Sequence, residues 1–422
     1  MLDRPRTIWS WAVYDWANSA FATTVIAGFF PVFFKAYWAD PSDPVESTFW
    51  LGVANSGASI LVAALAPVLG AIADRGSLKK GLLLLFATLG ILMSGGLWLV
   101  AQGDWVLAVA LYVIGTAGFM GANVFYDALI IGVASPKRRD YVSSLGFSLG
   151  YIGGGLLFAI NVLMYLYPGR FGIPDAATAI RLSFVSVAVW WALFSIPLVL
   201  FVHDPPNPDA VPLRRAVREG VAELVATARS LEQLRVVGLF LLAYWLYIDG
   251  VDTVIRMAVD YGMSLGFDAS SLIVALLVVQ FVAFPATLGY AWVASKIGVK
   301  RAVQVAIVAY GLITVLAFFM TSAHHFYILA GCIGLFQGGI QALSRSLYGR
   351  IIPPSKAGAF FGLYNMLGKF AAVIGPLLMG LVAKLSGSTR YGVISIVLLF
   401  VVGGLLLRKV DIEEGERLAQ EL

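Results

Sequence analysis

The longest polar stretch of the chain reads HDPPNPDAVPLRRAVREGVAELVATARSLEQL and covers residues 203–234. Its first six residues include three prolines, which cannot continue a helix because proline lacks a backbone N–H. Apolar residues then recur at three- and four-residue spacing from residue 213 to residue 231, opposite three arginines. This pattern predicts an amphipathic helix on the inner face of a membrane. A solvated linker helix is the alternative.

On both sides of this stretch the sequence is strongly hydrophobic. The 422 residues are 60% hydrophobic and only 13% charged, whereas a soluble domain carries about 25% charged residues. A spanning helix needs about 20 mostly apolar residues. The sequence therefore predicts an all-α integral membrane protein with twelve transmembrane helices, six before and six after the polar stretch. The twelve stretches are 9–38, 49–72, 81–101, 105–133, 142–167, 179–202, 235–259, 270–294, 301–321, 326–351, 357–384 and 391–407.

The positions of the basic residues orient these helices. If both termini are inside, 21 of the 29 Lys and Arg fall in the inner segments and five at the outer boundaries. This asymmetry follows the positive-inside rule and predicts that both termini are cytoplasmic. The net charge of +5 is then explained by topology, and the sequence indicates no nucleic-acid partner.

The two halves of the chain resemble each other, which indicates an internal duplication. Three groups of residues recur in the second half in the same order. They are Trp11, Asp15, Asn18 and Ser19 with Trp245, Asp249, Asp252 and Thr253; residues 73–75 and 79–80 with 294–296 and 300–301; and Gly115, Gly118 and Gly146 with Gly331, Gly334 and Gly362. The predicted organisation is a six-helix bundle (1–202), a cytoplasmic linker (203–234), a second six-helix bundle (235–407) and a cytoplasmic tail (408–422). This is the plan of the major facilitator transporters, whose binding site lies between the halves.

Several short motifs resemble one family of such transporters. Residues 14–21, YDWANSAF, resemble the vacuolar amino-acid effluxer family, which is named for a yeast autophagy protein and includes many bacterial members. Further similar motifs lie at 125–129, 150–154, 247–251, 338–346 and 361–364. The resemblance implies the major facilitator fold, a place in the bacterial cytoplasmic (inner) membrane, and an amino-acid-like solute.

The loop after the second hydrophobic stretch is also distinctive. Residues 70–80, GAIADRGSLKK, are similar to the signature loop of the major facilitator superfamily. In the second half, Ser295 stands where the loop's acid would be. Gly70, Asp74 and Arg75 could form a gating latch that ties the halves together when the site faces outward. The loop could instead be only a basic anchor at the inner face, but the resemblance favours the latch.

Seven charged residues lie inside the predicted spans, where insertion scales assign each a cost of at least about 2.5–3.5 kcal/mol. Six of them fall on the first, fourth, seventh and tenth spans, which line the central cavity in the major facilitator plan. Lys369, on the eleventh span, is the exception. The seven are Asp15, Asp127, Asp249, Asp252, Arg256, Arg345 and Lys369.

Helical spacing places other polar residues on the same helix faces as these charges. The neighbours are Asn18 for Asp15, Asn123 and Tyr126 for Asp127, and Gln341 for Arg345. We interpret these stripes as the walls of a wet cavity for substrate or proton translocation. The alternative is that the polar side chains only pair with one another to hold the bundle together. Asp252 and Arg256, one turn apart, are the strongest candidates for such a structural pair.

We therefore expect a secondary transporter that moves a small polar organic solute by alternating access. The embedded acids and arginines suit a zwitterion, whose ammonium would meet carboxylates and whose carboxylate would meet Arg345. The chain lacks phosphate-loop and zinc-protease motifs. We expect no enzymatic activity, no ATP, no metal and no cofactor, with a proton gradient as the energy source.

Two other functions stay open at this stage. One is an exporter of cationic amphiphilic compounds, favoured by the excess of acids and by the tryptophans. The other is a non-transporting membrane receptor or assembly factor. We expect a monomer surrounded by membrane lipid. Among the acids, we expect Asp249 to carry the coupling proton, because it lies about midway along its span, where water is scarcest.

Overall fold

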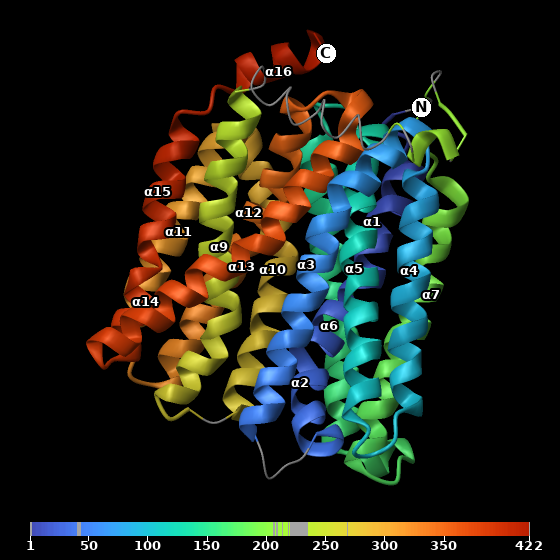
Figure 1. The fold of residues 1–422 in the computed structure, drawn as a ribbon. Helices are drawn as coiled ribbons and strands as arrows, with labels where there is room; N and C mark the ends of the chain where they lie inside the picture. Colours follow the sequence, from blue (N-terminus) through green and yellow to red (C-terminus); the bar gives the residue numbers. More distant parts are fainter. Residues whose placement is uncertain are drawn as a thin grey trace.

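The computed structural model describes residues 2–39, 44–205, 207, 210–212, 214–217, 219, 235–267 and 269–421, and the regular structure of these residues is helical throughout. The first half contains six membrane-length segments (Figure 1). They are α1 (Pro5–Ala20) with its continuation through α2 (Phe30–Phe33), α3 (Pro44–Gly76), α4 (Lys79–Gly96), α5 (Trp105–Val133), α6 (Arg139–Leu166) and α7 (Ala176–Phe201).

The second half repeats this arrangement and adds a short terminal helix. Its segments are α9 (Arg235–Ser264), α10 (Ala269–Ile297), α11 (Val299–Phe318), α12 (Ala323–Ile351), α13 (Ala357–Ser386), and the pair α14 (Thr389–Ser395) and α15 (Val397–Arg408). Each of the twelve predicted stretches corresponds to one segment, so the twelve-helix fold is confirmed. Within the described residues, eleven helices are long and apolar enough to span a membrane, and the described end of α13, Ile374–Ser386, is a shorter apolar stretch of that helix.

Short polar side chains start several of these helices. Asp104 accepts a hydrogen bond from the backbone amide of Leu107 at the start of α5. Asp175 accepts one from the amide of Thr178 at the start of α7, at 2.7 Å. Such caps satisfy backbone donors that have no partner within the helix. The polar turns between hydrophobic stretches therefore also fix where the helices begin.

The first spanning segment is not a regular α-helix along its length. Between α1 and α2, residues Phe21–Phe29 are π-helical, and Phe34–Trp38 after α2 are π-helical as well. Within the first of these turns, the Thr23 hydroxyl donates to the carbonyl of Gly154 in α6 at 3.2 Å. Such wider turns occur mostly as short insertions in α-helices and often lie at functional sites. Here Ala22, Thr23 and Ala27 of the first π-helical segment line the cavity described below.

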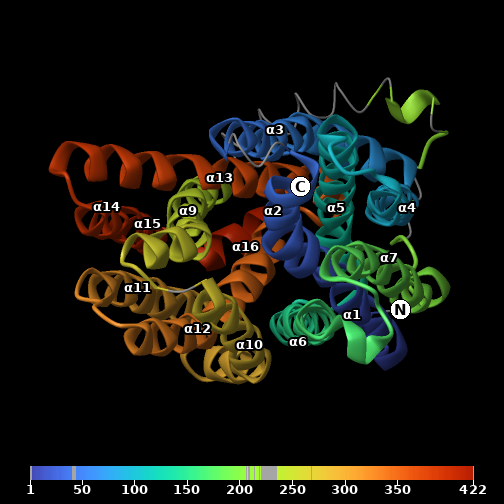
Figure 2. The same cartoon turned by 90° about the horizontal axis from the view of Figure 1, so that it is seen from below.

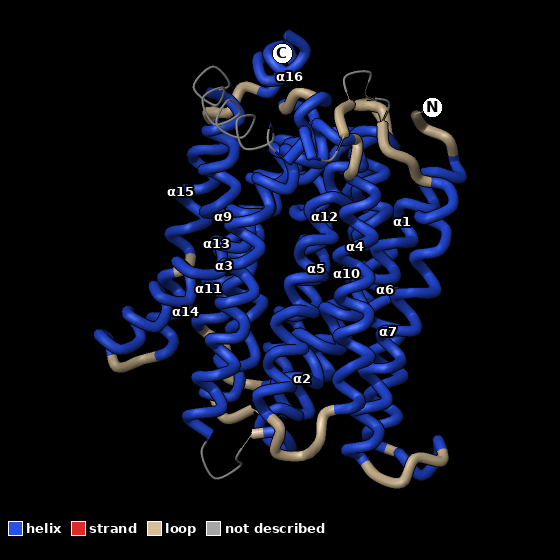
Figure 3. Tube along the Cα trace, turned by 45° about the vertical axis from the view of Figure 1, so that its right-hand side comes forward, coloured by secondary structure: helices blue, strands red, loops and turns tan. Residues whose placement is uncertain are grey.

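Both chain ends lie at the same end of the bundle (Figure 3). We call this end the termini side and the other end the opposite side. An even number of spans requires this placement. The termini side also carries α16 (Ile412–Glu421), an amphipathic helix within the predicted tail. Its Gly415 lies close to Ile351 and Val236, at the ends of α12 and α9.

The halves meet along two seams that the repeat relates to each other. In one seam α3 of the first half packs against α13 of the second, and in the other α10 of the second half packs against α6 of the first (Figure 2). Because α3 corresponds to α10 and α6 to α13 in the repeat, the two seams are equivalent. The polar cavity lies between them.

The linker is described only in part. Residues 214–217 are helical, but most of the amphipathic helix predicted between 213 and 231 lies outside the described residues. The start of the linker is fixed to the first half, because the Asp204 carboxylate accepts the backbone amide of Lys80 at 3.2 and 3.3 Å. Burial raises the pKa of Asp204, and the hydrogen bond from Lys80 offsets part of this rise.

Candidate translocation site

A cavity of about 490 Å³ lies between the two halves. Helices α1, α5 and α6 of the first half and α9, α10, α12 and α13 of the second contribute to its lining. Its termini-side end carries polar and charged side chains, whereas Tyr261, Met320 and Phe326 line it nearer the opposite side. A largely apolar cavity of this size with a few convergent polar groups is typical of a site for a small organic molecule.

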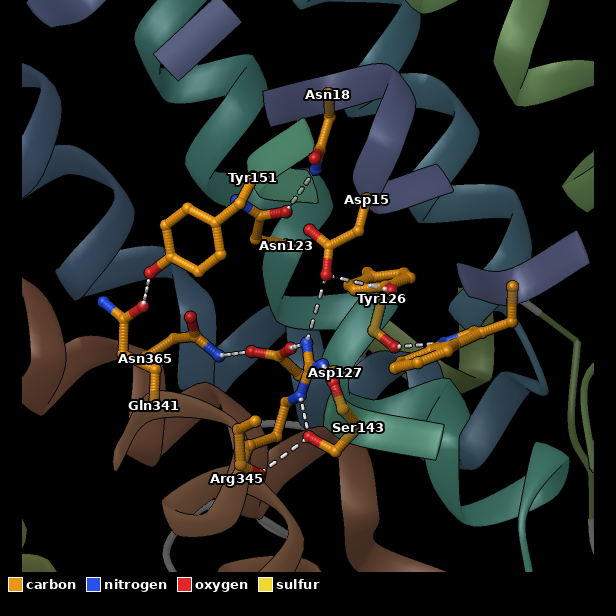
Figure 4. A network of polar contacts seen from close by, with 12 residues as sticks. Asp15, Asn18, Asn123, Tyr126, Asp127, Ser143, Tyr151, Gln341, Arg345 and Asn365 are labelled. Atoms are coloured by element: carbon orange, nitrogen blue, oxygen red, sulfur yellow. Dashed lines mark hydrogen bonds and ion pairs between the residues drawn. The ribbon is translucent and has the colours of Figure 1, made fainter. Parts of the chain in front are cut away.

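The polar end is organised around Arg345 of α12 (Figure 4). Its Nη1 donates to Asp127 Oδ1 at 3.0 Å, its Nε to Ser143 Oγ at 2.9 Å and its Nη2 to the Ser143 carbonyl at 2.9 Å. The side chain of Arg345 is only 3% exposed. A cation of the second half is therefore held by α5 and α6 of the first half.

Asp15 of α1 lies beside this ion pair. Its Oδ2 is 3.8 Å from Arg345 Nη1 and accepts a hydrogen bond from the hydroxyl of Tyr126 at 3.2 Å. The side-chain amide of Asn365 in α13 donates to Asp127 Oδ2 at 3.0 Å. Two buried carboxylates thus share one guanidinium. When both acids are ionised, the three charged groups together carry one excess negative charge.

Aromatic rings surround the same guanidinium. Its Cζ lies 4.2 Å from the ring centroid of Phe147, 5.0 Å from that of Trp11 and 5.4 Å from that of Tyr126. Trp11 and Tyr126 stack with centroids 4.3 Å apart. Cations over aromatic faces are attracted by the ring quadrupole, most strongly where water is excluded. The rings and the carboxylates together fix the position of Arg345.

Two further pairs of polar residues line the cavity. Asn18 Nδ2 donates to Asn123 Oδ1 at 2.6 Å, and the Tyr151 hydroxyl donates to Gln341 Oε1 at 2.7 Å (Figure 4). The second pair joins α6 to α12 and therefore crosses between the halves. The cavity thus brings together eight of the residues singled out in the sequence. They are Asp15, Asn18, Asn123, Tyr126, Asp127, Asp252, Gln341 and Arg345.

The polar residues predicted on one face of the seventh span, which is α9 in the structure, do not all face the cavity. Asp252 lines the cavity, but Asp249 is fully buried against α13. Both carboxylate oxygens of Asp249 accept the backbone amide of Gly375, at 3.0 and 3.1 Å. Thr253 donates to the same carboxylate at 3.3 Å. Asp249 is not among the cavity-lining residues. The side chains of Arg256 and Lys369 lie outside the described residues.

The predicted latch loop closes the termini side of the cavity. The Asp74 carboxylate accepts the amides of Gly358 and Ala359, in the first turn of α13, at 2.9 and 2.8 Å. Lys79 Nζ lies 2.5 Å from the same carboxylate. A carboxylate at a helix N-terminus is favoured by the helix dipole. Asp74 therefore joins the two halves.

Gly70 allows this approach of the helices. A Cβ at Gly70 would lie 2.2 Å from the carbonyl oxygen of Gly358, so no larger residue fits there without moving α3 from α13. Small residues let helix backbones approach closely within membranes. Arg75 lies next to the linker, where its carbonyl accepts the amide of Val211 at 3.0 Å.

A second contact at this side was not predicted from the sequence. Arg350 at the end of α12 forms an ion pair with Asp140 at the start of α6, and the Ser346 hydroxyl donates to the same carboxylate at 2.6 Å. Arg139 donates to the carbonyl of Gly349 at 2.5 Å. In the sequence Arg139 and Arg350 are basic residues near span ends and count toward topology, so nothing there distinguished their role in closing the halves together.

Twelve spanning segments in two repeated halves, with a polar cavity between them that is closed at one side, define a secondary transporter of the major facilitator superfamily. The match to known families is more specific. Residues 51–137 and 132–420 match the family described as "Vacuole effluxer Atg22 like", and the chain belongs to this family.

Individual relatives agree with this assignment. The chain is 39% identical over 414 residues to an uncharacterized MFS-type transporter, YxiO, of Bacillus subtilis, covering 98% of this chain and 96% of YxiO. It is 26% identical to autophagy-related protein 22 of Pichia angusta, over 83% of this chain and 72% of the relative. Among solved structures, the human organic anion transporter MFSD10 superposes with a TM-score of 0.71 at 18% identity, over 96% of this chain and 100% of MFSD10. The last similarity concerns the fold alone.

Proposed function

We propose that the chain moves a small, amino-acid-like organic solute across the bacterial cytoplasmic membrane by alternating access, driven by a proton gradient. The observation that carries this proposal is the ion pair between Arg345 of one half and Asp127 of the other, with Asp15 beside it. A group that neutralises one of these acids weakens a tether between the halves. Binding of the solute or proton and movement of the two halves then depend on the same ion pair.

The closed termini side supplies the second element of the mechanism. Asp74 joins α3 to α13, and Asp140 joins α6 to Arg350 of α12. With the termini in the cytoplasm, as the charge asymmetry favours, this arrangement corresponds to an outward-facing state. Return to an inward-facing state would separate both contacts and close the helices around the opposite end of the cavity.

We place the coupling proton on the pair Asp15 and Asp127 and not on Asp249. The two carboxylates share one guanidinium and line the cavity, where a proton can arrive with or against the solute. Asp249 is instead enclosed by the Gly375 amide and Thr253. A proton on one of the paired acids removes the excess negative charge and leaves Arg345 with a single anionic partner.

The test is transport into proteoliposomes, measured with a panel of labelled amino acids. Asp127→Asn and Asp15→Asn keep the side-chain shape but cannot titrate. We expect at least one of them to abolish proton-driven accumulation while exchange of labelled for unlabelled solute continues. Asp249→Asn is the matched control and should still accumulate solute. If only Asp249→Asn lost accumulation, the coupling proton would have to be assigned to Asp249 of α9.

The lining of the cavity also favours a second candidate function, an exporter of cationic amphiphilic compounds. Beyond its polar end, the cavity is walled mainly by apolar side chains, which suit the hydrophobic body of such a compound. These residues include Phe119, Phe158, Met257, Met320 and Phe326. The same proteoliposomes distinguish the candidates, because an amphiphilic cation would compete with amino-acid transport or replace it.

A further inference from the structure

We infer that the cavity recognises a protonated amine attached to an apolar body, and that a carboxylate on the solute contributes nothing to its binding in the state described here. This inference rests on the proposed transport function, and between its two candidate solutes it favours the amphiphilic cation over a zwitterionic amino acid. It replaces the expectation that Arg345 receives the carboxylate of a zwitterion.

The first argument is that Arg345 is already occupied. Its Nε and Nη2 donate to Ser143 and its Nη1 donates to Asp127. Three aromatic rings lie within 5.4 Å of its Cζ. With 3% of the side chain exposed, the guanidinium offers no free face of two N–H groups to a carboxylate. A bidentate carboxylate contact, which makes arginine a good anion receptor, is therefore unavailable.

The second argument is the charge of the cavity wall. Among the described side chains that line the cavity, Asp15, Asp127 and Asp252 are acids and Arg345 is the only Lys or Arg. If Arg256 pairs with Asp252, as their one-turn spacing predicts, the other described acids of the wall, Asp15 and Asp127, still outnumber Arg345 by one. Uncompensated charge in a low-dielectric region is unfavourable. A cationic occupant removes this cost, whereas an anionic occupant increases it.

The third argument is a buried acceptor without a partner. Gln337 lines the cavity and is 8% exposed, and among the described residues its Oε1 accepts no hydrogen bond. Gln341, one turn further along α12, is satisfied by the Tyr151 hydroxyl. Tyr151 also interacts with Gln337 and, electrostatically, with Asp15 and Asp252. An ammonium in this region would lie among the acids, and rotation of the Gln337 amide, whose oxygen is enclosed in the state described here, would bring that oxygen to an N–H donor.

The experiment uses four probes with the same phenyl body and different head groups: 2-phenylethylamine, phenylalanine, 3-phenylpropionate and 2-phenylethanol. Binding to the purified full-length chain in lipid nanodiscs is measured by calorimetry. We expect the amine to bind at least tenfold more tightly than the alcohol, phenylalanine to bind no more tightly than the amine, and the propionate not to bind. Tighter binding of phenylalanine or the propionate, or no binding by any probe at millimolar concentration, overturns the inference.

Variants locate the site. Gln337→Met removes the acceptor with little change in volume and should weaken amine binding at least fivefold without changing binding of the alcohol. Gln304→Met on α11, outside the cavity lining, is the matched control. Equal affinity of Gln337→Met and the unaltered chain for the amine contradicts the assigned site. The comparison of probes on the unaltered chain does not depend on whether this variant folds.

The outcomes also separate this inference from the proposed function. If an anion or a neutral compound is accumulated in proteoliposomes while the amine does not bind, the transport function stands and the cation site is wrong. If the amine binds as expected while no solute is accumulated or exchanged, the cation site stands and the transport proposal fails.

Discussion

Arg345 shows at the scale of one residue how a charge is accommodated within a membrane-spanning helix. A guanidinium in hydrocarbon is costly, but here ionised, hydrogen-bonding and aromatic partners surround it on all sides, from Asp127 and Ser143 to the ring of Phe147. All of these partners belong to the half opposite its own helix. The planar arrangement of the N–H donors of Arg345 is therefore as important as its charge.

We expect Arg345→Lys to fail although it keeps the charge. A lysine is a point charge that cannot donate simultaneously to Asp127 and to both oxygens of Ser143 in this geometry. Each lost hydrogen bond to a charged group contributes roughly 1.5–3 kcal/mol. The melting temperature of the purified protein should fall, and proton-driven transport should fall by about tenfold or more.

Arg181→Lys provides the matched comparison. Arg181 also lies over an aromatic ring, that of Trp98, and donates to a backbone carbonyl, but it has no acidic partner among the contacts described above. It should tolerate the exchange with near-normal transport. Normal transport by Arg345→Lys would mean that charge alone maintains the site.

At the scale of the helices, the seam between α3 and α13 closes one side of the molecule. In this seam the backbones of the two helices are in close contact at Gly70. The Asp74 carboxylate also accepts hydrogen bonds from backbone amides in the first turn of α13. The equivalent seam between α6 and α10 has no such carboxylate at the corresponding position, which is Ser295. Its neighbouring contacts include the Ser148 hydroxyl, which donates to the carbonyl of Phe284 at 2.6 Å.

We expect Asp74→Asn to weaken the closed state. An amide side chain can accept one of the two α13 amides but not both, and it leaves Lys79 without its anionic partner. Spin labels at Lys137 and Ser355, exposed on opposite halves of the termini side, report the separation by pulsed electron resonance after Cys332 is replaced. The distance distribution should shift to larger values, and solute affinity should stay near normal.

The control removes an aspartate that caps a helix at the other side of the molecule. Asp175→Asn affects the start of α7 and should leave the distances between the spin labels unchanged. If the distribution of distances between the spin labels were also unchanged in Asp74→Asn, the loop would only contribute to the orientation of the chain in the membrane.

The helices were predictable from the sequence, but several of their contacts were not. Hydropathy locates the spans because lipid requires about 20 apolar residues, and helical spacing places Asp15, Asn18, Asp127 and Arg345 toward a common cavity. Asn365 could not be predicted, since nothing in its own helix marks it. Its role depends on the approach of α13 to α5.

Asp249 shows the limit of helical periodicity. Its position near Asp252 suggests that both face the cavity, but α13 packs so closely that a Cβ at Gly375 would lie 2.0 Å from the hydroxyl of Thr253. The backbone amide of Gly375 is thus the partner of Asp249. Backbone partners that come from another helix leave no pattern in the sequence around the residue they bind.

At the scale of the whole molecule, the orientation in the membrane remains a prediction that labelling can test. In a chain with Cys332 replaced, a cysteine at Ala210 should be protected from a membrane-impermeant reagent in intact cells, whereas a cysteine at Gly172 should react. Both positions lie outside the spanning helices, and Gly172 is exposed. The same rule places 74–80, 136–140, 203–234 and 408–422 in the cytoplasm, and 40–47, 169–176 and 386–390 outside. Strong labelling at Ala210 in intact cells would invert the assignment.

The position of the Asp74 carboxylate has a consequence for how such a protein can evolve. In the proposed cycle the closure at the termini side is broken once in every turnover, and each 1.4 kcal/mol of its strength changes the rate of that step by about tenfold. Asp74 is far along the chain from the residues that line the cavity and does not itself line it. Substitutions at this one position can therefore change the rate of the cycle, for example in adaptation to a colder membrane. The solute specificity, which depends on the residues that line the cavity, stays the same.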